Sequence, residues 1–142
     1  MPSTKRKQTT TRIGGKRIRL VTTDGVTIAK PAPILEWELQ AEAVRRLRAL
    51  PEFDVTFTIA ADFNAGKRNA TKAKATGVTA GEPDLRVYAS QARLLLIEYK
   101  NSEGTLSADQ KKRHPLLRSL GYTVEVIKAA TPDECAAATV AL

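Results

Sequence analysis

Residues 81–84 read Gly-Glu-Pro-Asp, and after a short turn residues 94–100 read Leu-Leu-Leu-Ile-Glu-Tyr-Lys. The second stretch predicts a strand whose side chains alternate between two faces, so Glu98 and Lys100 point the same way and share their face with Leu96. A carboxylate at the margin of a buried face needs a partner, and a metal ion is a good candidate. Asp84 can supply a second carboxylate from a neighbouring strand. Two acids and a lysine on adjacent strands predict a site for metal-assisted hydrolysis of a phosphodiester.

The flanking sequence predicts an α/β fold built on a small mixed sheet flanked by helices. Apolar patterns and turn residues predict strands at 54–60, 85–89, 93–100 and 122–129, and helices at 34–50, at about 107–120 and from 131 onward. A helix between the last two strands favours a parallel crossover. Ser107 is the expected N-cap of the second helix, and Thr131 with Glu134 matches a capping box for the third. Pro115 predicts that the second helix bends or begins later.

The bulk properties indicate a globular protein with one core. The chain has 142 residues, and no apolar run approaches the roughly 20 residues that a membrane-spanning helix needs. The polar, basic N-terminus does not resemble a secretory signal. Cys135 is the only cysteine, which excludes an internal disulfide and fits a reducing compartment. We therefore expect a cytoplasmic location, no membrane contact, and a packing role for Cys135.

Positive charge is concentrated near the N-terminus. Residues 1–35 hold eight basic residues and one acid, whereas the rest of the chain is nearly neutral. Residues 1–15 are expected to be mobile, and residues 16–30 are expected to form a small hairpin around Asp24-Gly25. Such a segment suits a polyanion through phosphate contacts, although a merely solubilising tail is the alternative. We expect a basic N-terminal segment at 1–33 and a single domain at 34–142, with a long basic loop at 61–80.

A series of ordered motifs in the second part resembles the virus-type replication-repair nuclease (VRR-NUC) domain of the PD-(D/E)XK nuclease superfamily, whose core is restriction-endonuclease-like. The motifs, in chain order, are Glu36-Trp37-Glu38-Leu39-Gln40, Asn64-Ala65-Gly66, Gly81-Glu82-Pro83-Asp84-Leu85, Glu98-Tyr99-Lys100, Gly104-Thr105-Leu106-Ser107 with Gln110, and Leu120-Gly121-Tyr122. The resemblance covers roughly residues 34–129. Each motif alone is weak, and their order carries the resemblance.

The resemblance implies a set of site residues. The implied catalytic residues are Asp84, Glu98, Lys100, Glu36 and Gln110. The implied ligands of Mg²⁺ or Mn²⁺ are Asp84, Glu98, the backbone carbonyl of Tyr99, and Glu36, for which Glu38 is the competing helix-borne acid. Basic candidates for contact with nucleic acid are Lys67, Arg68, Lys72, Lys74, Lys111, Lys112 and Arg113. For the surface residues, an ordinary solvated role is the alternative.

The resemblance further implies a metal-dependent, structure-specific DNA endonuclease, most specifically of the Holliday-junction resolvase type. Such an enzyme would serve replication, repair or recombination in a bacterial or phage-infected cell. It would work on branched DNA as a homodimer, without a small-molecule cofactor. A flap, single-strand or restriction-type nuclease and a non-catalytic nucleic-acid-binding module remain alternatives, and an RNA substrate stays open. His114 is the only histidine, which disfavours a zinc site.

Overall fold

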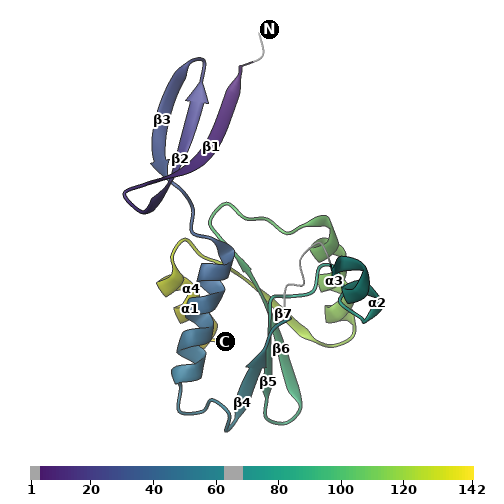
Figure 1. Ribbon diagram of the computed structural model, residues 1–142. Coiled ribbons are helices and arrows are strands. Elements are labelled where there is room, and N and C mark those ends of the chain that lie inside the picture. Colours follow the sequence, from purple (N-terminus) through teal and green to yellow (C-terminus); the bar gives the residue numbers. More distant parts are fainter. Residues whose placement is uncertain (1–3, 63–68) are drawn as a thin grey trace. The chain divides into compact units, whose positions relative to one another are not determined.

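The chain forms two separate structural units. The structure is a computed structural model that describes residues 4–62 and 69–142 (Figure 1). One unit spans Met1–Pro33 and the other spans Ile34–Leu142.

The larger unit is a small mixed sheet flanked by helices, as the sequence predicts. Its strands are β4 (Phe57–Ala60), β5 (Leu85–Ala89), β6 (Arg93–Lys100) and β7 (Thr123–Lys128), in spatial order β4-β5-β6-β7. The first three are antiparallel neighbours, and β6 and β7 are parallel. The helices are α1 (Glu36–Ala49), α2 (Ala70–Ala75), α3 (Ala108–Ser119) and α4 (Pro132–Val140). The crossover from β6 through α3 to β7 is the predicted parallel unit.

Alternation along β6 separates two hydrophobic clusters. Ile97 and Tyr99 pack with Leu39 of α1 and Cys135 of α4, while Leu96 packs on the other face with Leu117 of α3. In Figure 1, α1 and α4 accordingly lie together on one side of the sheet and α3 lies on the other. Glu98 and Lys100 lie on the same face of the sheet as Leu96, the face that α3 covers. Their side chains therefore lie near the start of α3.

Local capping explains where the last two helices start. The Ser107 hydroxyl accepts a hydrogen bond from the Gln110 N–H (3.2 Å), and the Gln110 side chain accepts one from the Ser107 N–H (2.8 Å). Thr131 caps α4 by accepting from the Glu134 N–H (3.2 Å). The capping box at α3 and the Thr131 cap at α4 confirm the predicted starts, but the Glu134 side chain accepts a hydrogen bond from the Ala130 N–H (3.3 Å) and does not complete a capping box with Thr131. Pro115 lies inside α3, so the helix continues through it and does not begin later.

Two predicted segments differ in the structure. The strand predicted at 54–60 is shorter, because Asp54 adopts a left-handed conformation (φ 59°) in a turn and Val55 is exposed. The loop predicted at 61–80 contains α2, a short helix of alanine, threonine and lysine without any buried residue. The motif Asn64-Ala65-Gly66 lies outside the described residues.

The N-terminal unit is a three-stranded antiparallel sheet. Its strands are β1 (Arg6–Ile13), β2 (Lys16–Thr23) and β3 (Val26–Pro31), with β2 in the centre. The hairpin predicted at 16–30 corresponds to β2 and β3, with its turn at Asp24-Gly25. The prediction of a mobile segment at 1–15 is wrong for residues 6–13, because these pair with β2 along their whole length.

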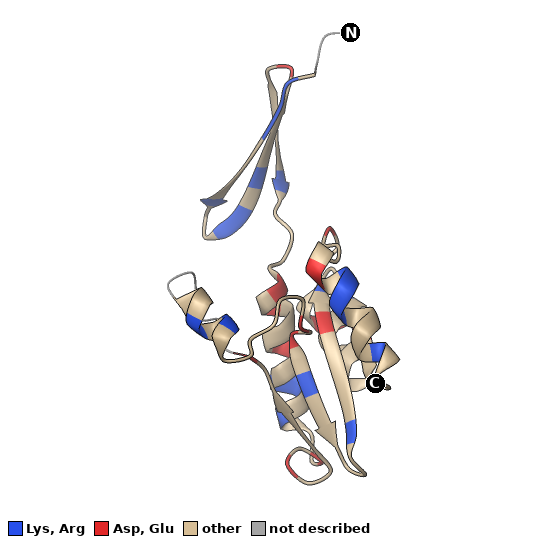
Figure 2. Ribbon diagram, turned by 90° about the vertical axis from the view of Figure 1, so that its right-hand side faces the viewer, with Lys and Arg blue, Asp and Glu red and all other residues tan. Residues whose placement is uncertain are grey.

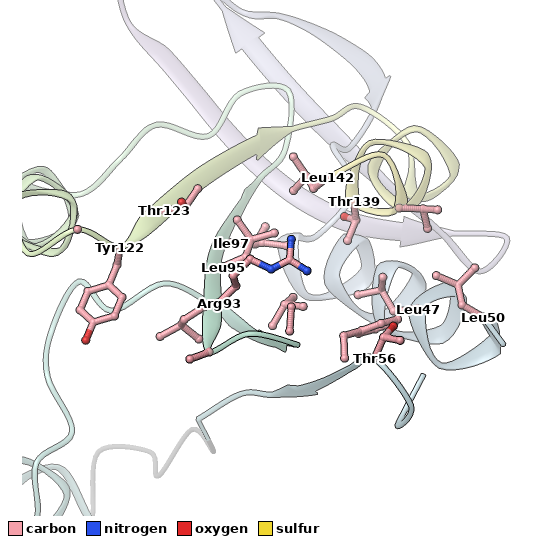
Figure 3. Close-up of a pocket in the computed structure, with 17 residues that line it drawn as sticks. Leu47, Leu50, Thr56, Arg93, Leu95, Ile97, Tyr122, Thr123, Thr139 and Leu142 are labelled. Atoms are coloured by element: carbon pink, nitrogen blue, oxygen red, sulfur yellow. The ribbon is translucent and has the colours of Figure 1, made fainter. Parts of the chain in front are cut away.

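A cavity of about 660 Å³ lies on the sheet face that carries Leu95 and Ile97, next to the end of α1 (Figure 3). Its lining is mostly apolar, with Arg93 and Thr139 among the exceptions. Since Leu95 and Ile97 alternate with Leu96 and Glu98 along β6, the cavity and the acidic side chains occupy opposite faces of the sheet. Among the described residues, no helix has the length and apolar character needed to cross a membrane.

Cys135 is fully buried, as its expected packing role requires. Burial raises the pKa of its thiol to about 11, because the interior disfavours the thiolate. Since the thiolate is the reactive form, we expect iodoacetamide at mildly alkaline pH to alkylate the native protein at least roughly 100-fold more slowly than the unfolded chain. Mass spectrometry over time measures both rates. Equal rates would contradict a buried thiol.

Candidate active site

Asp84 and Glu98 meet where β5 begins and β6 approaches its end. Leu85 pairs with Ile97 in the antiparallel register, so the preceding Asp84 lies opposite Glu98. The Asp84 Oδ2 atom accepts a hydrogen bond from the Tyr99 N–H (2.8 Å). Burial raises the pKa of Asp84, and the Tyr99 N–H opposes this shift. The sheet register therefore places both carboxylates together.

Glu98 is the most deeply buried acid of the group, with 1% of its surface exposed. Its Oε1 atom accepts a hydrogen bond from Gln110 Nε2 (2.6 Å) and lies 3.3 Å from Lys100 Nζ. Its Oε2 atom has no hydrogen-bond partner. Burial, followed by the negative charge of Asp84, raises the pKa of Glu98 to about 7. This carboxylate is thus held in a site that lacks enough positive charge to balance it.

Lys100 lies between Glu98 of β6 and Glu36 of α1. The Lys100 Nζ atom lies 3.3 Å from Glu98 Oε1 and 3.8 Å from Glu36 Oε2, and the lysine is buried. The competing acid, Glu38, instead accepts a hydrogen bond from the Leu35 N–H (2.9 Å) at the start of α1. Of the two helix-borne acids, Glu36 is therefore the one that reaches Lys100.

The first turn of α3 contributes Gln110 and, one turn later, His114. The His114 Nε2 atom lies 4.0 Å from Glu98 Oε2, and the ring is fully buried with neither nitrogen hydrogen-bonded. Burial, followed by the charges of Arg118 and Lys100, lowers the pKa of His114. The approach of His114 to Glu98 was not predicted from the sequence. The i, i+4 spacing from Gln110 was the signal that places both on one helix face.

A groove leads away from Asp84 along the side of the site. It has a volume of about 930 Å³ and runs past residues 78–84 to Trp37, Gln40 and Lys74. Gln40 Nε2 donates to the backbone oxygen of Asp84 at a long 3.4 Å. Trp37 is 65% exposed and so presents its ring to solvent. The N-termini of α1 and α3 both carry site residues, and helix N-termini attract anions.

The basic candidates fall into three groups. Lys72 and Lys74 are exposed on α2, and Lys111 and Lys112 are exposed on α3. Arg113 is instead held by Glu82, with its Nε 2.8 Å from Glu82 Oε2. Lys67 and Arg68 lie outside the described residues.

The donor set suits a hard divalent cation. Mg²⁺ usually takes one or two carboxylates and completes its shell with water and phosphate oxygens. Asp84 and Glu98 supply two carboxylates, and the buried Glu98 Oε2 has no hydrogen-bond partner. Within residues 4–62 and 69–142, no three His, Cys, Asp or Glu side chains gather as a complete metal centre. The residues therefore fit an ion that also relies on water and substrate for its ligands.

Neither protein-family models nor curated proteins gave a match to the chain. A solved structure described as a VRR_NUC domain protein is similar to it with a TM-score of 0.60 and 27% identity, over 78% of this chain and 88% of that chain. Another, described as a VRR_NUC domain, has a TM-score of 0.47 and 20% identity, over 70% of this chain and 88% of that one. The fold and the first likeness together support the expectation raised by the ordered motifs, that residues 34–129 form a VRR-NUC domain with a nuclease fold.

Proposed function

We propose that the protein is a metal-dependent, structure-specific DNA endonuclease that hydrolyses phosphodiester bonds, most specifically a resolvase of four-way junctions. The observation that carries the proposal is the cluster of Asp84, Glu98 and Lys100, which lies where β5 begins and β6 ends. One oxygen of the buried Glu98 has no hydrogen-bond partner. The similarity to a VRR_NUC domain protein supports the reaction class.

Asp84, Glu98, the carbonyl of Tyr99 and Glu36 would hold Mg²⁺ or Mn²⁺. When bound, the cation supplies charge neutralisation at the scissile phosphate and lowers the pKa of bound water. The raised pKa values of Asp84 and Glu98 support this role, because an added positive charge would relieve the repulsion between two buried carboxylates. Glu36 would join them from the N-terminus of α1.

The chain's own residues would position the reactants and balance the developing charge. In the reaction, a water oxygen bonds to phosphorus while the bond from phosphorus to the leaving sugar oxygen breaks. One new end keeps the phosphate and the other carries a hydroxyl. The ammonium group of Lys100 would stabilise the negative charge that grows on the phosphate oxygens. Gln110 would act as a positioning residue, because it holds Glu98 Oε1 and leaves Oε2 open.

The choice of a junction as substrate rests on chemistry and symmetry. Contacts with phosphates carry little information about the base sequence, so we expect the protein to recognise the shape of the DNA. Resolution of a four-way junction needs two symmetric cuts, and a homodimer with a two-fold axis would supply two sites. We therefore propose a homodimer on branched DNA. A monomer by light scattering, both with and without junction DNA, would contradict the dimer.

The test is cleavage of a labelled panel that contains a four-way junction, a flap, a splayed arm, a duplex and a single strand, in DNA and RNA forms. Reactions contain Mg²⁺, Mn²⁺ or EDTA. We expect metal-dependent cutting with the junction cut fastest. Preference for the flap, single strand or duplex would replace the resolvase with another nuclease. Binding of the junction without cutting of any substrate in either metal would favour the non-catalytic binding module.

Gln110→Ala is expected to lower the cleavage rate roughly 10- to 100-fold, as loss of a group that orients a metal ligand typically does. The rate should recover partly at high Mg²⁺ concentration, because the misplaced Glu98 would bind the ion more weakly. Titrations of rate against Mg²⁺ measure this effect.

The control is Ser107→Ala, which removes the other half of the same helix cap but leaves the Gln110 amide beside Glu98. We expect this variant to lose about 1 kcal/mol of stability and to keep its Mg²⁺ requirement. If both variants show the same Mg²⁺ dependence, Gln110 acts only through the cap.

Trp37 is expected to stack on an unpaired base beside the cleaved phosphate, because it is exposed at the groove that leads to Asp84. Since it is the only tryptophan, its fluorescence reports on this position alone. Junction DNA added in EDTA should quench it, and Trp37→Ala should weaken binding about 10-fold, the scale of one stacked base. Tyr122→Ala, which removes an exposed aromatic ring next to the apolar cavity, is the control. Unchanged emission at saturating DNA would exclude stacking.

A further inference from the structure

The register of the N-terminal sheet gathers positive charge on one face. Side chains that are cross-strand partners share a face, and alternate residues along a strand share it too. Arg12 pairs with Arg17, and Arg19 pairs with Lys30. We call the surface that carries these residues the basic face, and its basic members are Arg6, Arg12, Arg17, Arg19 and Lys30. Of the basic residues in these strands, only Lys7 and Lys16 lie on the opposite face.

Figure 2 shows the imbalance along these three strands, which are marked blue at several positions and red only at one turn. The red mark is Asp24, the only acidic residue in residues 1–33. It lies in the turn beside the Arg6 end of β1, and Arg12 is six residues further along the strand, a span of about 20 Å. Like charges directly across a sheet are destabilising. The pair Arg12–Arg17 therefore reduces the sheet's stability unless an anion covers it.

Two of the arginines are held in place by neutral partners. Arg12 Nη1 donates to the backbone oxygen of Gly15 (3.1 Å), and Arg17 Nη1 donates to that of Pro33 (2.9 Å). A carbonyl oxygen orients a guanidinium without neutralising its charge. These contacts restrict the side chains before binding, which lowers the entropy lost when a ligand arrives.

From this arrangement we propose that the basic face binds the phosphate backbone of duplex DNA, independently of the nuclease site. Arginine and lysine provide phosphate contacts, and Thr10 and Thr23 on the same face add hydroxyl donors. No aromatic residue occurs in residues 1–33, so the face has no ring on which an exposed base could stack. A duplex, whose bases are enclosed and whose phosphates are exposed, fits this chemistry better than a single strand. The inference goes beyond the proposed cleavage reaction and does not depend on it.

The test compares two double variants of the full chain that remove the same charge from the two faces of one sheet. Arg12→Gln with Lys30→Gln alters the basic face, and Lys7→Gln with Lys16→Gln alters the opposite face. Fluorescence anisotropy of a labelled duplex, in EDTA and over about 50–200 mM salt, gives the slope of log affinity against log salt concentration. Each phosphate contact contributes about 0.9 to that slope.

We expect the basic-face variant to lose about 2 from the slope and roughly 10- to 100-fold in affinity near 0.1 M salt, while the opposite-face variant keeps the slope of the parent. A third variant, Arg12→Lys with Lys30→Arg, keeps the charge and should keep the slope, which separates charge from damage to the sheet. Equal losses in the two Gln variants would reduce the effect to net charge and overturn the proposal. An unchanged slope in both Gln variants would also overturn the proposal. So would a basic-face variant that binds the duplex as the parent does and loses binding only to anionic lipid vesicles.

Because no cleavage takes place in EDTA, these results are independent of the substrate panel. A protein that cuts nothing can still show the face-specific change in slope, and a nuclease can lack it. Deletion of residues 1–15 would be a poorer test, since it removes β1 and exposes an edge of β2.

Discussion

Lys100→Met is expected to slow junction cleavage about 100- to 1,000-fold, the scale of losing one group that stabilises transition-state charge. Methionine keeps most of the buried stem of the side chain while removing the ammonium group. The change leaves Glu98 without its nearest cation, at 3.3 Å, so the carboxylate would hold a proton more tightly. We expect the affinity for junction DNA, measured in EDTA, to change only a few-fold. Single-turnover kinetics at saturating enzyme separate the chemical step from binding.

The matched control is Arg93→Met, which removes one positive charge from the other end of the same strand. Arg93 borders the apolar cavity on the opposite face of the sheet, and its Nε donates to the Ser90 carbonyl. Its loss should leave the cleavage rate unchanged. An active Lys100→Met enzyme, or equal rate losses in both variants, would remove Lys100 from the reaction.

Gly81→Ala is expected to be the most damaging small substitution in the loop before β5. Gly81 has φ of 82°, and a Cβ atom there would lie 2.5 Å from the backbone oxygen of Asp109 and 2.8 Å from the backbone nitrogen of Gln110. Backbone atoms at the start of α3 would have to move. Backbone strain of about 1–3 kcal/mol adds to a packing cost of similar size. We expect a loss of roughly 2–5 kcal/mol in the free energy of unfolding, together with slower cleavage.

Gly121→Ala serves as the control at the other end of α3. Gly121 also has a positive φ, of 96°, but a Cβ atom there would meet nothing within 4 Å. Only the backbone strain remains, so a loss of about 1 kcal/mol is expected. Urea unfolding measures both variants. If they lose equal stability, the contact between Gly81 and the start of α3 has relaxed and the explanation fails.

The sequence predicted the elements whose signals are local. The apolar strands β5, β6 and β7 and the capped starts of α3 and α4 all agree with it, because alternation and capping act within a few residues. β1 was missed because its run of lysine, arginine, glutamine and threonine has no apolar face to detect. α2 was missed for the same reason, since alanine and lysine favour a helix without marking a buried side.

In the candidate site, too, local patterns were predicted and contacts between distant segments were not. Strand alternation alone predicted that Glu98 and Lys100 share a face, and the register supplies Asp84 beside them. Contacts between distant segments could not be predicted in this way. The ion pair of Arg113 with Glu82 and the approach of His114 to Glu98 depend on how α3 packs, which no short pattern encodes.

Four residues, 32–35, separate β3 from α1, and Pro33 stiffens this connection. A short tether turns a second binding event into an intramolecular one, with an effective concentration on the order of millimolar. If the basic face holds a duplex arm, the nuclease site would meet nearby DNA at that concentration, however dilute the protein. Weak contacts at the groove beside Asp84 would then suffice for capture, and release of the cut product would become the slow step at low salt.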